Sequence, residues 1–180
     1  MVRGAVLTGD YGGSPARKYW MYLAISEYFE NVRPLDDFVQ ILINFGETLD
    51  DKAKVTLPLR GAYSRTRRSI LRLSWDHDTW EDLDRTKDPY LLVLPKPLSS
   101  FKPAEDQFII MRFPEAISRP TQYVEVLDEI ASEIKSGRDI FEWKNRSRKD
   151  KGVPQRLLEA IEAKPGAFGF SIDLKKLLTG

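Results

Sequence analysis

The chain has 180 residues, 42% of them hydrophobic and 31% charged, which is typical of one globular domain with a sizeable apolar core. It has no cysteine and one histidine, which excludes disulfides, cysteine nucleophiles and metal sites built on two histidines. The 28 basic and 27 acidic side chains leave a net charge of +1, so nothing draws the whole chain to DNA or to an anionic membrane. Because no apolar run approaches the roughly 20 residues of a membrane helix, we expect a cytoplasmic protein.

A glycine-rich break separates the first residues from the rest. Residues 9–13, Gly-Asp-Tyr-Gly-Gly, follow a short apolar stretch at 4–8 and precede a helix start at Ser14 and Pro15. The break lacks the Gly-Lys-Ser/Thr ending of a phosphate loop and so indicates a connector with a helix cap. We therefore predict an N-terminal arm or linker at residues 1–14, in which 4–8 is a short strand or part of the arm, and one domain at 15–180.

Two helices are predicted next. From residue 16 to 32 the apolar side chains fall at helical spacings and cover much of the circumference. This pattern predicts a long N-terminal helix that is buried on several sides or packs against a second copy of itself, and that Pro34 ends. The apolar spacing predicts a second helix over 36–45, with Gly46 as its C-terminal stop.

A charged region follows a short predicted strand at 54–59. Five arginines crowd residues 60–72 and five carboxylates crowd 76–84, and the apolar residues within 70–75 could form a strand between them. Arginine suits bidentate phosphate contacts, so the first cluster is either a phosphate site or is neutralised by the carboxylates within the fold. The sequence favours neither interpretation over the other.

The remaining elements alternate in type. Two apolar strands are predicted at 90–94 and 108–113, joined by a long connection that makes a hairpin tip or a flap. An amphipathic helix is predicted over 121–136, and Pro154 opens a last one. The order of elements predicts an α/β fold, with a mixed central sheet surrounded by helices.

The residues themselves favour binding over catalysis. The chain has no Gly-X-Ser-X-Gly motif, and no pair of carboxylates stands out for acid and base work. We expect a domain without enzymatic activity, cofactor or metal. The candidate ligand is a small anion with aromatic character, such as a nucleotide.

Several segments are similar to one family. Residues 23–35 resemble the first long helix of the cyclic-dinucleotide receptor domain of bacterial STING proteins, through a Leu-Ala pair, a Tyr-aromatic pair, an Asn and a Pro at similar spacing. Residues 55–59 are similar to the family's strand that ends in proline, and 90–94 and 108–113 to the two strands of its ligand lid. Residues 113–117 stand where bacterial members have an Asp-Phe-Pro-Thr-Thr-Leu turn leading into a helix.

The resemblance implies a non-enzymatic receptor. Its long N-terminal helix would form a V-shaped homodimer, or part of a higher oligomer, and a cyclic dinucleotide of the cyclic di-GMP or cyclic GMP-AMP type would bind in the cleft between the two copies. The family implies a role in antiviral or antiphage innate immune signalling. It also implies an effector, a TIR domain or membrane segment, which this sequence does not contain.

The resemblance also implies the binding residues. Arg112 takes the place of an acidic residue and Glu115 the place of a threonine in the family's turn, so both are carried over by position. The predicted contacts comprise aromatic and polar residues of the first helix, two turn residues and four looser phosphate candidates: Tyr28, Phe29 and Asn31; Arg112 and Glu115; Arg65, Arg68, Arg85 and Lys87.

Two other functions compete with the receptor. One is a nucleotide- or nucleoside-processing enzyme, in which residues 9–14 cradle the substrate and Asp10 or Glu115 serves as acid or base. The other is an interaction module without a small ligand, in which the first helix contacts a partner.

Overall fold

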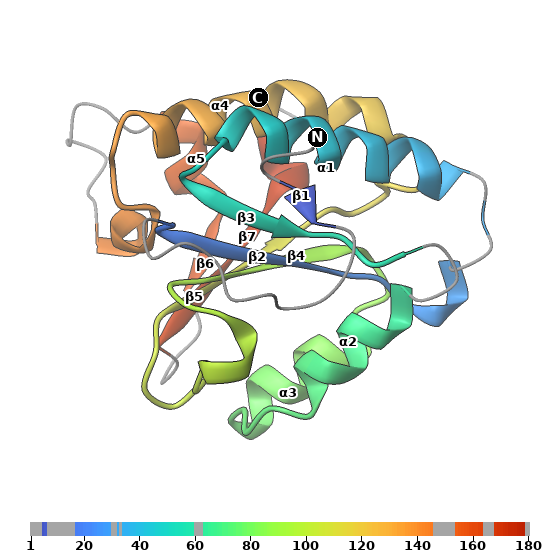
Figure 1. Ribbon diagram of the computed structural model, residues 1–180, viewed down its shortest axis with the longest axis vertical. Coiled ribbons are helices and arrows are strands. Elements are labelled where there is room, and N and C mark those ends of the chain that lie inside the picture. The colour runs from blue at the N-terminus through green and yellow to red at the C-terminus, as the bar shows by residue number, and fades with distance from the viewer. Residues whose placement is uncertain are drawn as a thin grey trace.

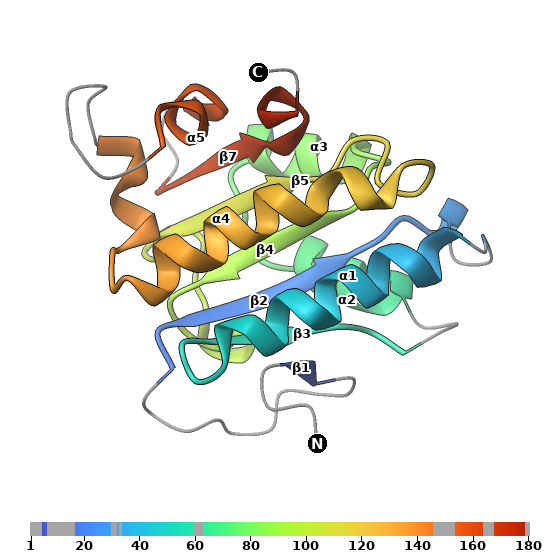
Figure 2. The same cartoon turned by 90° about the horizontal axis from the view of Figure 1, so that it is seen from above.

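The protein folds around one mixed sheet. The computed structural model describes residues 5–6, 17–29, 32, 34–59, 63–145, 154–163 and 168–178. They form a seven-stranded sheet of order β1-β3-β2-β4-β5-β7-β6. Helices α1 (Pro34–Leu49) and α4 (Val124–Lys135) lie side by side over one face, and α2 (Tyr63–Leu71) and α3 (His77–Arg85) lie under the other (Figures 1 and 2). The predicted α/β class with a mixed sheet is confirmed.

The centre of the sheet is a strand where the sequence predicted a helix. β2 (Tyr19–Ala24) pairs in parallel with β3 (Ala53–Thr56) and antiparallel with β4 (Tyr90–Leu94). All of its residues are buried, because alternate side chains enter the two apolar clusters on the two faces of the sheet. A continuous apolar run fits a strand covered on both faces as well as it fits a buried helix. The predicted long N-terminal helix is therefore wrong, and a short 3₁₀ helix, η1 (Glu27–Phe29), follows the strand instead.

The elements on either side of β2 are closer to expectation. β1 (Ala5–Val6) pairs in parallel with β3, which agrees with the strand alternative for residues 4–8. Helix α1 forms where predicted but continues past Gly46, because Leu49 still packs into the core. The helix ends before Asp50, whose φ of 48° takes the chain out of the helical conformation.

The charged region forms two helices rather than a strand. The predicted strand at 70–75 is wrong, because α2 runs to Leu71 and two indoles bind its last carbonyls. Trp75 Nε1 donates to Ile70 O at 2.8 Å and Trp80 Nε1 to Leu71 O at 3.2 Å. Asp76 then caps α3, with its Oδ1 accepting from Thr79 N at 2.9 Å.

The second half follows the predicted pattern through α4, and Pro154 also opens the predicted last helix, α5 (Gln155–Glu159). β4 and β5 (Phe108–Arg112) form the predicted antiparallel pair, and their connection contains η2 (Leu98–Ser100). The predicted helix at 121–136 corresponds to η3 (Pro120–Tyr123) and α4. The remaining elements are the short ones at the C-terminal end: η4 (Ile140–Asn145), β6 (Ile161–Ala163), β7 (Gly169–Asp173) and η5 (Leu174–Leu177). β7 joins the sheet in parallel beside β5, with β6 antiparallel at the edge.

Strand direction defines a special edge of this sheet. β2, β3, β5 and β7 run in one direction, and β4 runs against them between β2 and β5. The chain continues from β2 through α1 to β3, toward one edge of the sheet, and from β5 through α4 and later elements to β7, toward the other edge, while α1 and α4 stay over the same face. In open α/β sheets, ligands bind outside the carboxyl ends of strands at such a switch point.

Across the described ranges, no helix has the length and apolar character needed to span a membrane.

Candidate functional site

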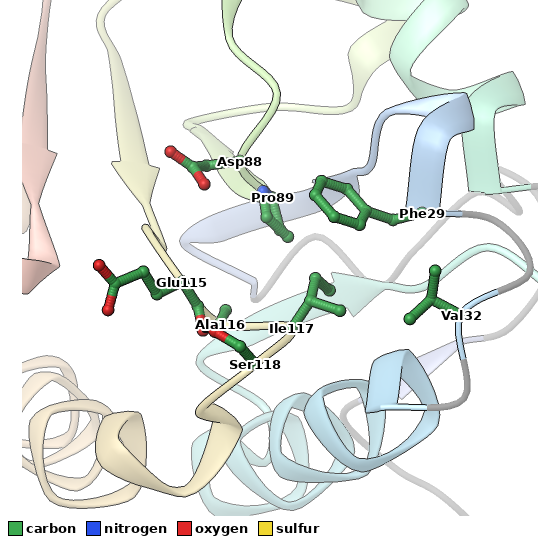
Figure 3. Close-up of a pocket in the computed structure, with 8 residues that line it drawn as sticks. All are labelled: Phe29, Val32, Asp88, Pro89, Glu115, Ala116, Ile117 and Ser118. Carbon is green, nitrogen blue, oxygen red and sulfur yellow. Dashed lines mark hydrogen bonds between the residues drawn. The ribbon is translucent and has the colours of Figure 1, made fainter.

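A pocket of about 250 Å³ lies at this switch point. Three connections supply its walls: the segment after β2, the residues before β4 and the turn after β5 (Figure 3). The lining residues are Phe29, Val32, Asp88, Pro89, Glu115, Ala116, Ile117 and Ser118. We call it the carboxyl-edge pocket.

One end of the carboxyl-edge pocket is apolar. The side chains of Phe29, Pro89 and Ile117 face one another across the hollow, and Val32 approaches Ile117 (Figure 3). The ring of Tyr28 packs edge-on against the ring of Phe29, with 5.0 Å between the ring centroids and nearly perpendicular planes. Tyr28 itself is 78% exposed beside the pocket. This end can enclose a flat apolar ring.

The other end is acidic. The carboxylates of Asp88 and Glu115 lie away from Phe29 and Val32 (Figure 3). Lys175 of η5 places its Nζ 2.5 Å from Glu115 Oε1, and this hydrogen bond, with the lysine's charge, lowers the pKa of Glu115. Both carboxylates point away from the apolar part of the hollow (Figure 3), so they can accept hydrogen bonds from donor groups of a ligand that extends beyond that part.

The turn that carries Glu115 is held rigidly. Glu115 has φ of 60°, which is uncommon for a residue with a side chain, and its carbonyl accepts from Ser118 N at 3.1 Å and Arg119 N at 2.9 Å. Tyr123 donates from its hydroxyl to Pro114 O. Burial, and then the charges of Asp173, Asp88 and Glu115, raise the pKa of Tyr123, which keeps this donor protonated.

The carboxyl-edge pocket includes some of the predicted contacts. Phe29 and Glu115 line it and Tyr28 lies beside it, whereas Asn31 falls outside the described residues. Val32 also lines it. Arg112 does not: its side chain reaches the α3 face and pairs with Asp82.

The other predicted cations lie elsewhere. Arg85 pairs with Glu81 at 2.5 Å, one turn away on α3, and Lys87 is exposed just before Asp88. Arg65 and Arg68 are exposed on α2, where Arg68 hydrogen-bonds Ser64 Oγ at 3.3 Å. Among the residues that the structure describes, no arginine lines the carboxyl-edge pocket.

The arginine cluster has a third explanation that the sequence did not suggest. Arg67 donates to the last carbonyls of α3, at 2.6 Å to Asp84 O and 3.2 Å to Leu83 O. It therefore satisfies carbonyls that have no partner within the helix. Arg60 and the glycine-rich residues 9–14, with Asp10, lie outside the described residues.

Three residues in or beside the pocket that the sequence did not single out come from short connections. Asp88 and Pro89 form an Asp-Pro step directly before an apolar strand, and Lys175 follows a strand that was not predicted. The Asp-Pro step was a usable signal for a strand start. The position of this step opposite Phe29 could not be predicted, because it depends on β2 and β4 being neighbours in the sheet.

No metal centre accompanies the pocket in the described part of the chain. There, no three or more histidine, aspartate or glutamate side chains gather closely enough to hold an ion. Comparisons with models of protein families, with curated proteins and with solved structures find no match.

Proposed function

We propose that the chain is a non-enzymatic binding domain for a nucleobase-containing ligand, cyclic dinucleotides included, and that the carboxyl-edge pocket holds one base. The observation that carries this proposal is the pairing of an apolar end, with Phe29 and Ile117, with an acidic end, with Asp88 and Glu115. A guanine base has both features required, a flat ring and an edge with ring and exocyclic N–H donors.

The size of the carboxyl-edge pocket supports one base rather than a whole dinucleotide. Its volume of about 250 Å³ lies just below the roughly 300–1,000 Å³ of pockets that enclose drug-sized ligands. The sugar and phosphate would therefore project from the mouth. A two-fold symmetric cyclic dinucleotide would use two copies of the chain, one for each base, without the long helix that the sequence suggested for the dimer.

The charge state of Glu115 supports binding over catalysis. A general base works best when its pKa lies near the working pH, and Lys175 moves the pKa of Glu115 in the opposite direction. The enzymatic alternative also relies on residues 9–14, which lie outside the described residues.

A thermal-shift titration tests the proposal. We expect guanine nucleotides, linear or cyclic, to raise the melting temperature, since a hundredfold excess over Kd adds about 2.7 kcal/mol of stability. Phe29→Ala should weaken binding at least tenfold, and Val124→Ala, an exposed apolar residue on α4, should not. The absence of a shift with any guanine nucleotide, or equal effects of the two variants, would overturn the proposal.

One observation favours a second function for the same edge. Tyr28 is 78% exposed and Val32 is 38% exposed, so an apolar rim borders the carboxyl-edge pocket. Exposed apolar patches often mark protein contacts. If this rim is the functional surface, Tyr28→Ala will weaken self-association or partner binding, measured by sedimentation, and no nucleotide will change the melting temperature.

A further inference from the structure

A second cavity lies at the opposite end of the sheet. Its volume is about 340 Å³, and its walls come from the α2–α3 connection and from the loop between β4 and β5. The lining residues are Arg72, Leu73, Ser74, Phe101, Lys102, Pro103, Ala104 and Glu105. We call it the loop cavity, and the proposed function makes no use of it.

The loop that forms this cavity is fixed by contacts to the rest of the fold. Leu98 N donates to the hydroxyl of Tyr22 on β2 at 2.9 Å. Asp106 accepts from Lys102 N and from Lys96 Nζ, both at 2.8 Å, and so closes the loop on itself. The cavity therefore does not depend on a ligand for its shape.

An aromatic cluster forms the base of the loop cavity. Phe101 is buried, and its ring lies 5.8 Å from that of Trp75 and 6.1 Å from that of Phe108. Leu73 and Pro103 extend this apolar surface to the walls. A ligand with a flat or apolar body can pack there.

The donor side chains around the loop cavity, those of Arg72, Ser74 and Lys102, form few hydrogen bonds or ion pairs with other described residues. The guanidinium of Arg72 and the hydroxyl of Ser74 make no hydrogen bond or ion pair with any residue that the structure describes. Lys102 Nζ lies 3.1 Å from Glu105 Oε2, but both side chains are 63% exposed, so water competes strongly with this pair. An anion can therefore form hydrogen bonds with Arg72 and Ser74 without breaking an existing one to a described residue, and it can replace Glu105 as the partner of Lys102.

We infer that the loop cavity binds a small organic anion, a phosphate ester or carboxylate attached to a flat apolar body. Arg72 binds the head group through two parallel N–H donors, and Ser74 adds a third hydrogen bond. Lys102 supplies a second positive charge. The body of the ligand packs against Leu73, Phe101 and Pro103.

Isothermal titration calorimetry of the full chain with phenyl phosphate tests this inference. We expect phenyl phosphate to bind more tightly than inorganic phosphate or phenol, because only the ester fills both the polar rim and the apolar base. A matched titration with phenylacetate, an aryl carboxylate, distinguishes a general anion site from one that requires phosphate. Binding of neither aryl anion, or equal binding of inorganic phosphate and the ester, would overturn the inference.

Three variants locate the site. Arg72→Gln should weaken phenyl phosphate binding at least tenfold, and Glu105→Gln should strengthen it several-fold because the competing carboxylate is gone. Lys135→Gln, an exposed lysine on α4, is the control with the same charge change and should have no effect. Equal losses in Arg72→Gln and Lys135→Gln would reduce the binding to a general charge effect, and weaker binding in Glu105→Gln would contradict the proposed competition.

Amide chemical shifts provide a readout that does not depend on the variants. Phenyl phosphate should move the amide signals of Leu73, Ser74 and Ala104 and leave those of Phe29 and Ile117 in place. Shifts confined to the carboxyl-edge pocket would assign the anion to that pocket and refute the loop cavity as its site.

Discussion

The carboxyl-edge pocket and the loop cavity are both hollows with apolar walls at the two ends of one sheet, and they differ in the charge at their rims. Asp88 and Glu115 stand at the first, and Arg72 and Lys102 stand at the second. In both places the connections between strands and helices supply the walls as well as the charge, and the sheet holds those connections in place. We therefore expect ligand preference in this fold to be determined by a few loop residues and not by the strands themselves.

The two hollows also differ in how their charges are balanced. At the carboxyl-edge pocket, Lys175 binds Glu115 from outside the lining and leaves Asp88 at the rim. At the loop cavity, the acid Glu105 stands inside the lining beside Lys102. A ligand must therefore displace an internal ion pair only at the loop cavity.

Two buried phenylalanines offer the strongest test of whether the hollows are independent. Phe113 packs between Phe38 and Tyr123, at 5.1 and 5.2 Å between ring centroids, and holds the turn of the carboxyl-edge pocket. We expect Phe113→Ala to lower the free energy of unfolding by about 3–5 kcal/mol, measured by urea denaturation, and to abolish nucleotide binding.

The matched variant is Phe101→Ala in the aromatic base of the loop cavity. It should cost a similar amount of stability but should abolish phenyl phosphate binding and leave nucleotide binding in the folded protein unchanged. Loss of both ligands in either variant would show that the hollows are coupled through the sheet.

How far sequence predicts these two ends can be argued from particular residues. β4, β5 and α4 were predictable because each carries its own pattern between clear boundaries, such as the prolines around residues 90–94. β2 was not, since a strand buried on both faces has no alternation to distinguish it from a buried helix. Helix α2 was missed because its core contact is concentrated at Ile70, and the indoles that end it come from Trp75 and Trp80.

The candidate sites were less predictable than the fold. Phe29 and Glu115 were suggested by a resemblance whose first-helix segment, residues 23–35, contains the end of β2 and the short η1 instead of a long helix, and the structure places them in one pocket for a different reason. Arg112 was expected beside Glu115, but β5 alternates and directs Arg112 to the α3 face. Arg72 belongs to the same arginine cluster in the sequence as Arg67. In the structure Arg72 lines the loop cavity with Lys102, whereas Arg67 binds a carbonyl at the end of α3, and the sequence does not reveal this difference.

A buried hydroxyl gives a smaller test on the carboxyl-edge pocket alone. Tyr123→Phe removes the hydrogen bond to Pro114 O while keeping the ring in place. We expect a loss of about 1–2 kcal/mol in the free energy of unfolding, together with faster amide hydrogen exchange at Ala116 and Ser118. Binding of phenyl phosphate should not change, and a matching loss there would contradict the separation of the two hollows.

Asp106 stabilises the loop that forms the loop cavity, and this stabilisation depends on its carboxylate being ionised. Burial alone would raise the pKa of Asp106, but hydrogen bonds from Lys96 and from Lys102 N outweigh it and lower the pKa. The stabilisation is therefore present above the unfolded-state pKa of about 3.9 and is lost as pH falls through the folded-state value. We expect Asp106→Asn to cost about 1 kcal/mol at pH 7 in thermal melts and to remove part of the acid-induced loss of stability below about pH 4. An unchanged slope of stability against pH in this range would contradict the assignment to Asp106.

The smallest expected effect tests the charge difference itself. Lys175 and Glu115 are 47% and 44% exposed, so Lys175→Met should change the free energy of unfolding only slightly. The pKa of Glu115 should rise toward its ordinary value, because the hydrogen bond and charge that lower it are gone. The stability that the pair provides above the unfolded-state pKa, and that the wild type loses on acidification, should then be absent. At neutral pH the acidic end becomes more negative, so guanine nucleosides, which carry donors and no phosphate, should bind a few-fold more tightly, as measured by calorimetry. A few-fold weaker binding would mean that Lys175 contacts the ligand. A cation would then contribute to ligand binding at both hollows, although no cation is among the described residues that line the carboxyl-edge pocket.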